Sequence, residues 1–202
     1  MRYGDNIKEV ASLQPDFMGF IFYPPSPRNA IGISEVSVKQ LPDGIKAVGV
    51  FVDAPLEEVK RVTGNYEIGI VQLHGNETSV FCREIKLTGL QVIKAIRIPA
   101  NADSNFFESL AEYVGFVDMF LFEPQGMKAG GNGIKFDWCI TDYYNLPVPY
   151  LLSGGIGPED GDILKKGLPK GCIGIDLNSK FEITPGVKDS GKLKTFIRRI
   201  NE

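Results

Sequence analysis

The 202-residue sequence contains only one histidine, His74, and three widely spaced cysteines, Cys82, Cys139 and Cys172. A single histidine excludes a metal site with several histidine ligands, and the cysteines form neither a C-x-x-C pair nor any other metal-ligand spacing. Since an odd number of cysteines without an export signal is typical of reduced thiols, we predict a cytoplasmic location and no bound metal.

The sequence also lacks a basic stripe and a long apolar run. Its net charge is −3 and its pI is about 5.4, which argues against nucleic acid as a partner. No apolar stretch approaches the ~20 residues of a membrane span, so we predict no membrane partner. The hydrophobic fraction of 43% is enough for one sizeable core, which predicts a single domain over residues 1–202.

Apolar runs and helix-like segments alternate along the chain. The apolar runs, typical of strands buried on both faces, occupy residues 17–22, 46–52, 68–73, 92–96, 118–122, 149–152 and 172–177. The helix-like segments occupy residues 6–13, 34–41, 53–62, 78–87, 104–113, 136–144, 158–166 and 190–200. This alternation predicts an α/β fold with a parallel sheet. Seven strands after an opening helix match a (β/α)8 TIM barrel whose first strand is missing.

The carboxyl ends of barrel strands are where such folds carry chemistry. In this sequence those ends carry polar residues, in the order Arg28, Asp53, His74, Arg97, Glu123 and Asp176. Each has a structural alternative, such as a solvated charge for Arg28 or a helix cap for Asp53. Glu123 stands between an apolar strand and a glycine-rich loop that includes residues 130–133, a candidate mobile lid. A general acid or base there requires a pKa raised by partial burial.

Residues 149–179 predict a β-α-β unit with small and polar residues at both strand ends. Gly154 and Gly155 follow the first strand of the unit, and Asn178 and Ser179 follow the second. Backbone amides exposed by glycine, beside hydroxyl and amide side chains, suit a phosphate group. A tight turn and a helix cap are the structural alternatives.

Six sequence segments together carry a more specific signal. They are residues 15–28 (PDFMGFIF with SPR), 48–52 (VGVFV), 71–75 (VQLHG), 130–138 (GGNG with FDW), 153–156 (SGGI) and 176–189 (DLNS with PGVKD). In this order and spacing, over nearly the whole chain, they resemble the phosphoribosylanthranilate isomerase family of tryptophan biosynthesis. The resemblance implies a (β/α)8 barrel that converts N-(5-phosphoribosyl)anthranilate to 1-(2-carboxyphenylamino)-1-deoxyribulose 5-phosphate. The reaction is an Amadori rearrangement, and the family uses no metal or cofactor for it.

The same resemblance implies roles for individual residues. Glu123 matches the general acid, where family members usually carry Asp. Arg28 resembles the arginine that holds the substrate's anthranilate carboxylate or steers its reacting end. The other matches line the mouth of the barrel, at His74 and Asp176, or form the phosphate clasp, at Gly154, Gly155, Asn178 and Ser179.

The chain departs from the family pattern at its start. Family members usually open with a strand that ends in Cys-Gly-Met-Arg, whose cysteine is the general base. Here Met1-Arg2 aligns with the end of that motif, so the first strand and the catalytic cysteine are absent. A start codon placed too late and a decayed or repurposed relative are the two explanations for this departure.

Three further expectations follow from the missing strand and base. We expect the activity of this chain to be impaired. The alternative functions are a non-catalytic phosphate-ligand binder and another phosphosugar enzyme on a TIM barrel. A gap in the barrel also exposes two strand edges, which favours pairing between chains, as in a homodimer.

Overall fold

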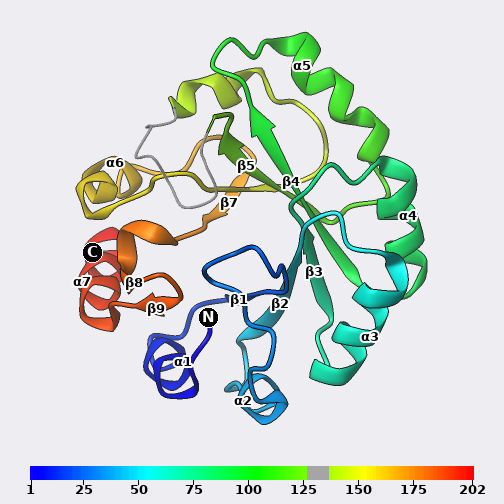
Figure 1. Cartoon of the computed structure of the whole chain (residues 1–202). Helices are drawn as coiled ribbons and strands as arrows, with labels where there is room; N and C mark the ends of the chain where they lie inside the picture. The colour runs from blue at the N-terminus through cyan, green and yellow to red at the C-terminus, as the bar shows by residue number, and fades with distance from the viewer. Residues whose placement is uncertain (127–136) are drawn as a thin grey trace.

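Seven parallel strands form one curled sheet in the computed structural model, which describes residues 1–126 and 137–202. The strands, each paired with the next along the chain, are β1 (Phe17–Ile21), β2 (Lys46–Phe51), β3 (Ile70–Leu73), β4 (Gln91–Ile98), β5 (Met119–Pro124), β6 (Tyr150–Leu152) and β7 (Cys172–Ile175). Helices surround this sheet on its outer side (Figure 1). The predicted TIM-barrel-like α/β fold with one missing strand is therefore confirmed. The candidate lid at residues 130–133 lies outside the described residues.

The helices largely follow the predicted segments. They are α1 (Gly4–Ala11), α2 (Glu35–Lys39), α3 (Leu56–Tyr66), α4 (Ser79–Leu87), α5 (Ser104–Ser109), α6 (Gly161–Leu164) and α7 (Ser190–Asn201). Short 3₁₀ turns are η1 (Leu110–Tyr113), η2 (Trp138–Tyr143), η3 (Pro158–Asp160) and η4 (Ser179–Phe181). No described helix has both the length and the apolar character needed to cross a bilayer.

Two differences from the predicted elements concern the second half of the chain. The predicted α-helix over residues 136–144 is instead the 3₁₀ helix η2, where the side chain of Asp137 accepts a hydrogen bond from the Cys139 amide. A small antiparallel hairpin, β8 (Glu182–Thr184) with β9 (Val187–Lys188), was not predicted. Its strands are too short to produce an alternating pattern in the sequence.

Both faces of the sheet are buried. The face that lines the barrel interior carries a small apolar cluster of Val48, Ile70, Ile93, Ala95, Met119, Leu121 and Leu151. The opposite face packs against the helices through a larger cluster that includes Phe51, Phe120, Phe122 and Tyr150. Because side chains alternate along a strand, every second residue after an interior residue also points into the barrel.

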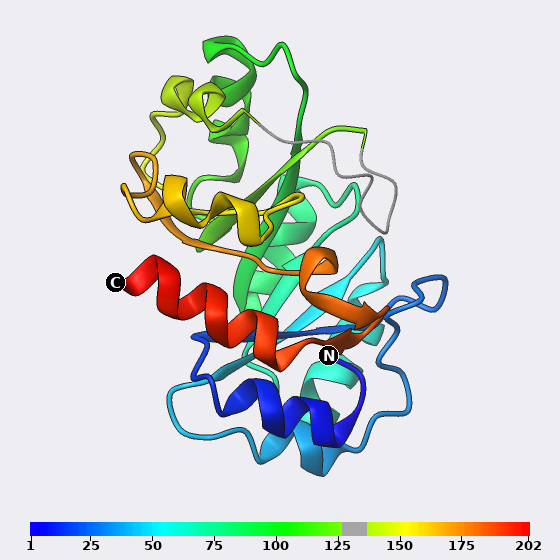
Figure 2. The same cartoon turned by 90° about the vertical axis from the view of Figure 1, so that its left-hand side faces the viewer.

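No described strand pairs with the outer edges of β1 and β7, so strand pairing does not close the ring. The first helix of the chain instead meets the last helix and the hairpin before it. The helix α1 lies beside α7 and the β8–β9 hairpin (Figure 2). The buried Asn6 side chain donates to the Lys188 carbonyl at 2.8 Å and accepts from the Lys188 amide at 2.8 Å. This pair of bonds joins residues 182 positions apart along the chain.

We predict that Asn6→Ala lowers the free energy of unfolding by about 1–3 kcal/mol, because it leaves a buried amide and a buried carbonyl without partners. Urea unfolding at constant temperature measures this loss. The exposed Asn105→Ala is the matched control, since Asn105 bonds only to the nearby Asp103 carboxylate. An equal effect of the two substitutions would contradict the closure role of Asn6.

Candidate active site

Strand alternation brings together, at the mouth of the barrel, three of the polar strand-end residues that the sequence analysis named. Ile70, Ile93 and Met119 point into the interior, so the residue four positions after each points the same way. Those residues are His74, which directly follows β3, and Arg97 and Glu123, which are the last residues but one of β4 and β5. The parallel pairing of β4 with β5 sets Arg97 directly opposite Glu123.

The centre of this group is the contact between His74 and Glu123. The His74 Nε2 atom lies 3.1 Å from Glu123 Oε1 and 3.2 Å from Oε2, and Arg97 Nε lies 3.3 Å from Oε1. On the other side of the ring, Gln72 Nε2 donates to His74 Nδ1 at 2.8 Å. An Nδ1 atom that accepts a hydrogen bond leaves the ring proton on Nε2, where it is donated to Glu123.

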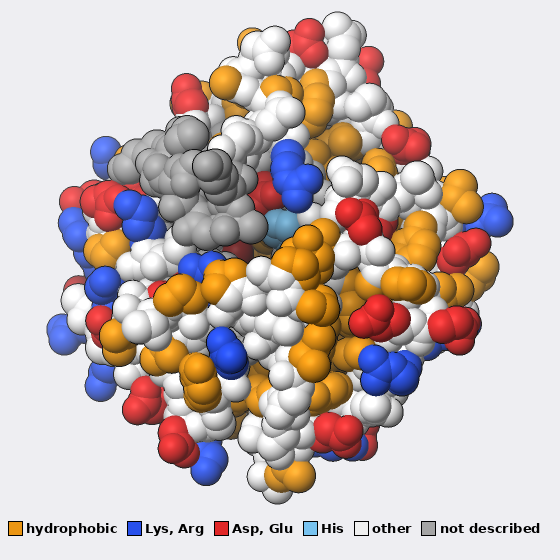
Figure 3. Space-filling view, in the orientation of Figure 1, with side chains coloured by type: hydrophobic (Ala, Val, Ile, Leu, Met, Phe, Trp, Pro, Cys, Tyr) orange, Lys and Arg blue, Asp and Glu red, His pale blue; other side chains and the backbone are white. Residues whose placement is uncertain are grey.

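The group is open to solvent on one side. Figure 3 shows histidine surface near the middle of this face, beside basic and acidic side chains. The Glu123 side chain is only 15% exposed, whereas the Arg97 side chain is 44% exposed. A ligand at the mouth could therefore contact this group.

The electrostatics of Glu123 differ from the expected ones. Burial raises the pKa of the Glu123 carboxyl, but the hydrogen bond from His74 and the charge of Arg97 lower it by more. The net pKa lies below its ordinary value, so the unliganded protein does not have the raised pKa that a general acid at this position needs. Glu123 is therefore a carboxylate before substrate binds.

The residues predicted to bind phosphate follow two neighbouring strands, β6 and β7. Gly154 and Gly155 adopt positive φ angles of 94° and 73°, which glycine accommodates best. They line a cavity of about 270 Å³ together with Asp137, Trp138, Cys139, Ile156, Asp160 and Ile163. Asn178 and Ser179 do not line this cavity. The two strand ends are nevertheless linked, because Ser153 Oγ donates to Asp176 Oδ2 at 2.9 Å.

The unpredicted hairpin supplies two charged residues near the expected clasp. Lys188 Nζ donates to Asn178 Oδ1 at 2.7 Å and lies 3.3 Å from Glu182 Oε1. Arg28 donates to Glu182 through Nε and through Nη2, the latter at 2.6 Å from Oε2. Arg28 is therefore largely buried, at 8% exposure, and its partner is a carboxylate of this protein.

Burial raises the pKa of the Glu182 carboxyl, but Arg28 and Lys188 lower it to a net value below the ordinary one. Glu182 and Lys188 were missed because their hairpin was missed. Gln72 was missed because it lies inside an apolar strand, although its spacing of two from His74 was a usable signal.

The comparisons with known proteins agree with this geometry. Residues 1–199 match the family model described as N-(5'-phosphoribosyl)anthranilate (PRA) isomerase. The chain belongs to the PRA isomerase family. A protein of Parabacteroides distasonis named N-(5'-phosphoribosyl)anthranilate isomerase is 40% identical to it, over 99% of this chain and 90% of that protein.

Solved structures of PRA isomerases share the fold. The structure from Thermotoga maritima has a TM-score of 0.81 and 28% identity, and the match covers 100% of this chain and 95% of that one. Another phosphoribosyl anthranilate isomerase was solved in complex with reduced 1-(o-carboxyphenylamino)-1-deoxyribulose 5-phosphate. Its TM-score is 0.78 and its identity 27%, with the same coverage of the two chains.

We predict that, at pH values above the ordinary carboxyl pKa, ionised Glu123 stabilises the folded protein by about 1–2 kcal/mol. This is the size expected of a charge-assisted hydrogen bond. A carboxyl whose folded pKa is depressed loses this contribution as the pH falls through that pKa. The advantage of the unsubstituted protein over Glu123→Gln should therefore shrink as the pH falls below 4.5. Urea unfolding between pH 7 and pH 3 measures it. The exposed Glu108→Gln serves as control, and an advantage that grows toward low pH would contradict the depressed pKa.

Proposed function

We propose that this protein catalyses the Amadori rearrangement of N-(5'-phosphoribosyl)anthranilate in tryptophan biosynthesis. The observation that carries the proposal is the Glu123–His74 pair at the strand ends of a barrel that belongs to the PRA isomerase family. The ligand in the related solved structure, an aminodeoxyribulose phosphate, supports a phosphosugar substrate. The proposal requires no metal or cofactor, and the protein is proposed to act in the cytoplasm as a single barrel domain over residues 1–202.

In the first chemical step, the Glu123–His74 pair supplies the proton that opens the sugar ring. Glu123 donates a proton to the furanose ring oxygen, the bond between that oxygen and C1 breaks, and a Schiff base forms with the anthranilate nitrogen. Glu123 is ionised in the free protein, so it must first take up this proton. The substrate is an anion that also displaces water, and both effects raise the pKa of a nearby carboxyl.

The second step removes the C2 proton, which gives an enolamine that becomes the ketone. By family resemblance the base is a cysteine at the end of a strand that precedes Met1-Arg2. A positioned general base contributes roughly 10²–10⁴-fold to rate, so a version that consists of residues 1–202 alone should turn over slowly. The extra methylene of Glu123, relative to the usual Asp, adds to this, since misplacement by about 1 Å can cost ~100-fold.

The remaining predicted residues orient the substrate. Arg28 uses Nε and Nη2 for Glu182, and Nη1 has no partner among the described residues, so we assign Nη1 to the anthranilate carboxylate. His74 and Asp176 line the mouth. The phosphate is assigned to the loop amides and side chains of Gly154, Gly155, Asn178 and Ser179. The outer edges of β1 and β7 pair with no described strand, which supports a homodimer as a further part of the proposal.

We predict that purified protein abolishes the fluorescence of freshly prepared phosphoribosylanthranilate. The 202-residue version should do so slowly, and a version with an added first strand that ends in Cys-Gly should do so faster. Glu123→Gln in the faster form should lower kcat by ~10²–10⁴-fold, because it removes the acid. Glu108→Gln is the control. If neither form turns over, the catalytic proposal fails and the alternative of a non-catalytic phosphate-ligand binder gains support.

We predict that Gly155→Asp abolishes binding of inorganic phosphate, because it places a carboxylate where the phosphate should lie. Calorimetric titration with phosphate measures the change. Gly89→Asp is the control for backbone strain, since Gly89 has a similar φ of 90° at the remote end of α4. Equal phosphate affinity in the Gly155→Asp and unsubstituted proteins would remove the phosphate site from this loop.

A further inference from the structure

A lysine lies buried behind the active site. Lys94 occupies the middle of β4, and its neighbours Ile93 and Ala95 point into the barrel, so its own side chain points toward the helices. The side chain is 3% exposed. Its ammonium donates to the Leu73 carbonyl at 3.2 Å, to the Gly75 carbonyl at 2.9 Å and to Glu77 Oε2 at 3.0 Å. All three N–H donors of the ammonium are thus used.

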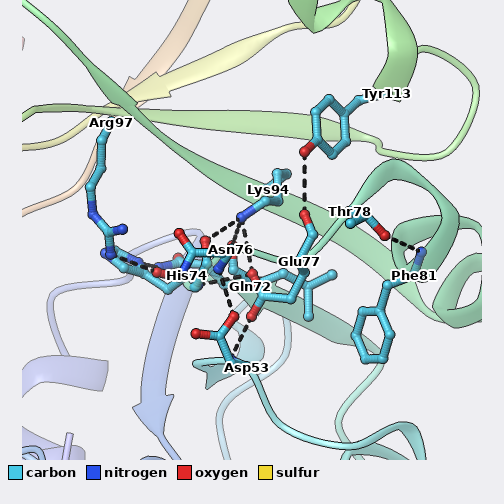
Figure 4. A network of polar contacts seen from close by, with 12 residues as sticks. Asp53, Gln72, His74, Asn76, Glu77, Thr78, Phe81, Lys94, Arg97 and Tyr113 are labelled. Atoms are coloured by element: carbon cyan, nitrogen blue, oxygen red, sulfur yellow. Dashed lines mark hydrogen bonds and ion pairs between the residues drawn. The ribbon is translucent and has the colours of Figure 1, made fainter.

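The partner Glu77 is equally buried and makes contacts of the same kind. Its Oε1 accepts from the Asp53 amide at 2.9 Å, and its Oε2 accepts from the Gly75 amide at 2.9 Å. Figure 4 shows Glu77 between Lys94 and Asp53, with Tyr113 donating to the Glu77 carbonyl. The carboxylate therefore ties the end of β2 to the loop that follows β3.

Asp53 completes the attachment of this loop. It does not cap α3, whose N-cap is Pro55, and the expectation of a helix cap is wrong. Its Oδ1 instead accepts from the Asn76 amide at 2.6 Å. A Cβ atom on Gly75 would lie only 2.3 Å from that oxygen, so the loop and Asp53 are packed without spare room.

These contacts converge on His74. Lys94 binds the carbonyl before it and the carbonyl after it, at Leu73 and Gly75. The His74 amide donates to the Phe51 carbonyl at 2.8 Å, and the His74 carbonyl accepts from Arg97 Nη2 at 3.0 Å. The backbone of His74 is therefore fixed from both neighbouring strands, β2 and β4, and with it the direction in which the ring leaves the chain.

We propose that Lys94 and Glu77 are positioning residues that hold the His74 ring against Gln72 and Glu123 in the geometry needed for proton transfer. The proposal rests on the proposed function of the Glu123–His74 pair. A buried ion pair contributes little net stability over apolar residues of similar volume, so stability alone does not account for it. The four contacts that the two side chains make outside the pair all go to backbone groups, of Leu73, Gly75 and Asp53.

The ring of His74 can be observed directly, because the chain has no other histidine. Nitrogen-15 NMR of the ring in the full chain should show one dominant tautomer with the proton on Nε2. Lys94→Met keeps the unbranched apolar stem, one atom shorter, but removes all three donors, and we expect it to give a mixture of the two tautomers. Lys86→Met, which removes a partly exposed ion pair with Asp118, is the matched control and should leave the tautomer unchanged.

The double variant Lys94→Met/Glu77→Met separates positioning from stability. It removes both buried charges, so its urea midpoint should recover toward that of the unsubstituted protein, while the tautomer mixture persists. In the form that turns over, we expect kcat to fall by ~10–100-fold with KM changed less than about threefold. If Lys94→Met does not fold, the double variant decides the test.

A folded variant without the pair that keeps the single Nε2–H tautomer would overturn the positioning role. Failure of the proposed function has a different signature, since it abolishes turnover in the unsubstituted protein while its ring tautomer remains as described. The tautomer measurement therefore tests the positioning role whether or not the chain is active.

Discussion

The in-register parallel pairing of β3, β4 and β5 is the constraint on which the candidate site depends. Their shared direction puts three strand ends at one rim, and alternation turns His74, Arg97 and Glu123 inward together. A shift of one residue in any strand would turn its polar end residue toward the helices. The apolar interior cluster below the rim, with Ile70, Ile93 and Met119, fixes that register.

Charge is distributed in layers around this rim. At the surface, the Glu123 carboxylate lies beside the imidazole of His74 and the guanidinium of Arg97, and its pKa lies below the ordinary value. Behind the sheet, Lys94 and Glu77 neutralise each other in a layer that is otherwise apolar. On the far side of the mouth, Glu182 forms ion pairs with both Arg28 and Lys188. In each of these three groups a charged side chain is neutralised by one from another part of the chain.

Most of the fold could be predicted from the sequence, because buried parallel strands are continuous apolar runs and those runs are visible without tertiary information. Strand ends differ by one or two residues, as for β4, predicted at residues 92–96 and observed at Gln91–Ile98. The sign of the Glu123 pKa shift could not be predicted, since it depends on neighbours from two other strands. Lys94 lies inside an apolar run, and only the fold reveals Glu77 beside it.

The amide clasp between Asn6 and Lys188 has a consequence for how the molecule is made. The sheet grows by pairing each strand with its predecessor, so most of it forms from contacts that are local in sequence. The clasp needs a residue near each end of the chain, and such contacts form slowly. During synthesis α1 must therefore wait for its partner until Lys188 has left the ribosome. Until then the polar side chain of Asn6 and the apolar face around it stay exposed, which favours misassembly between nascent chains.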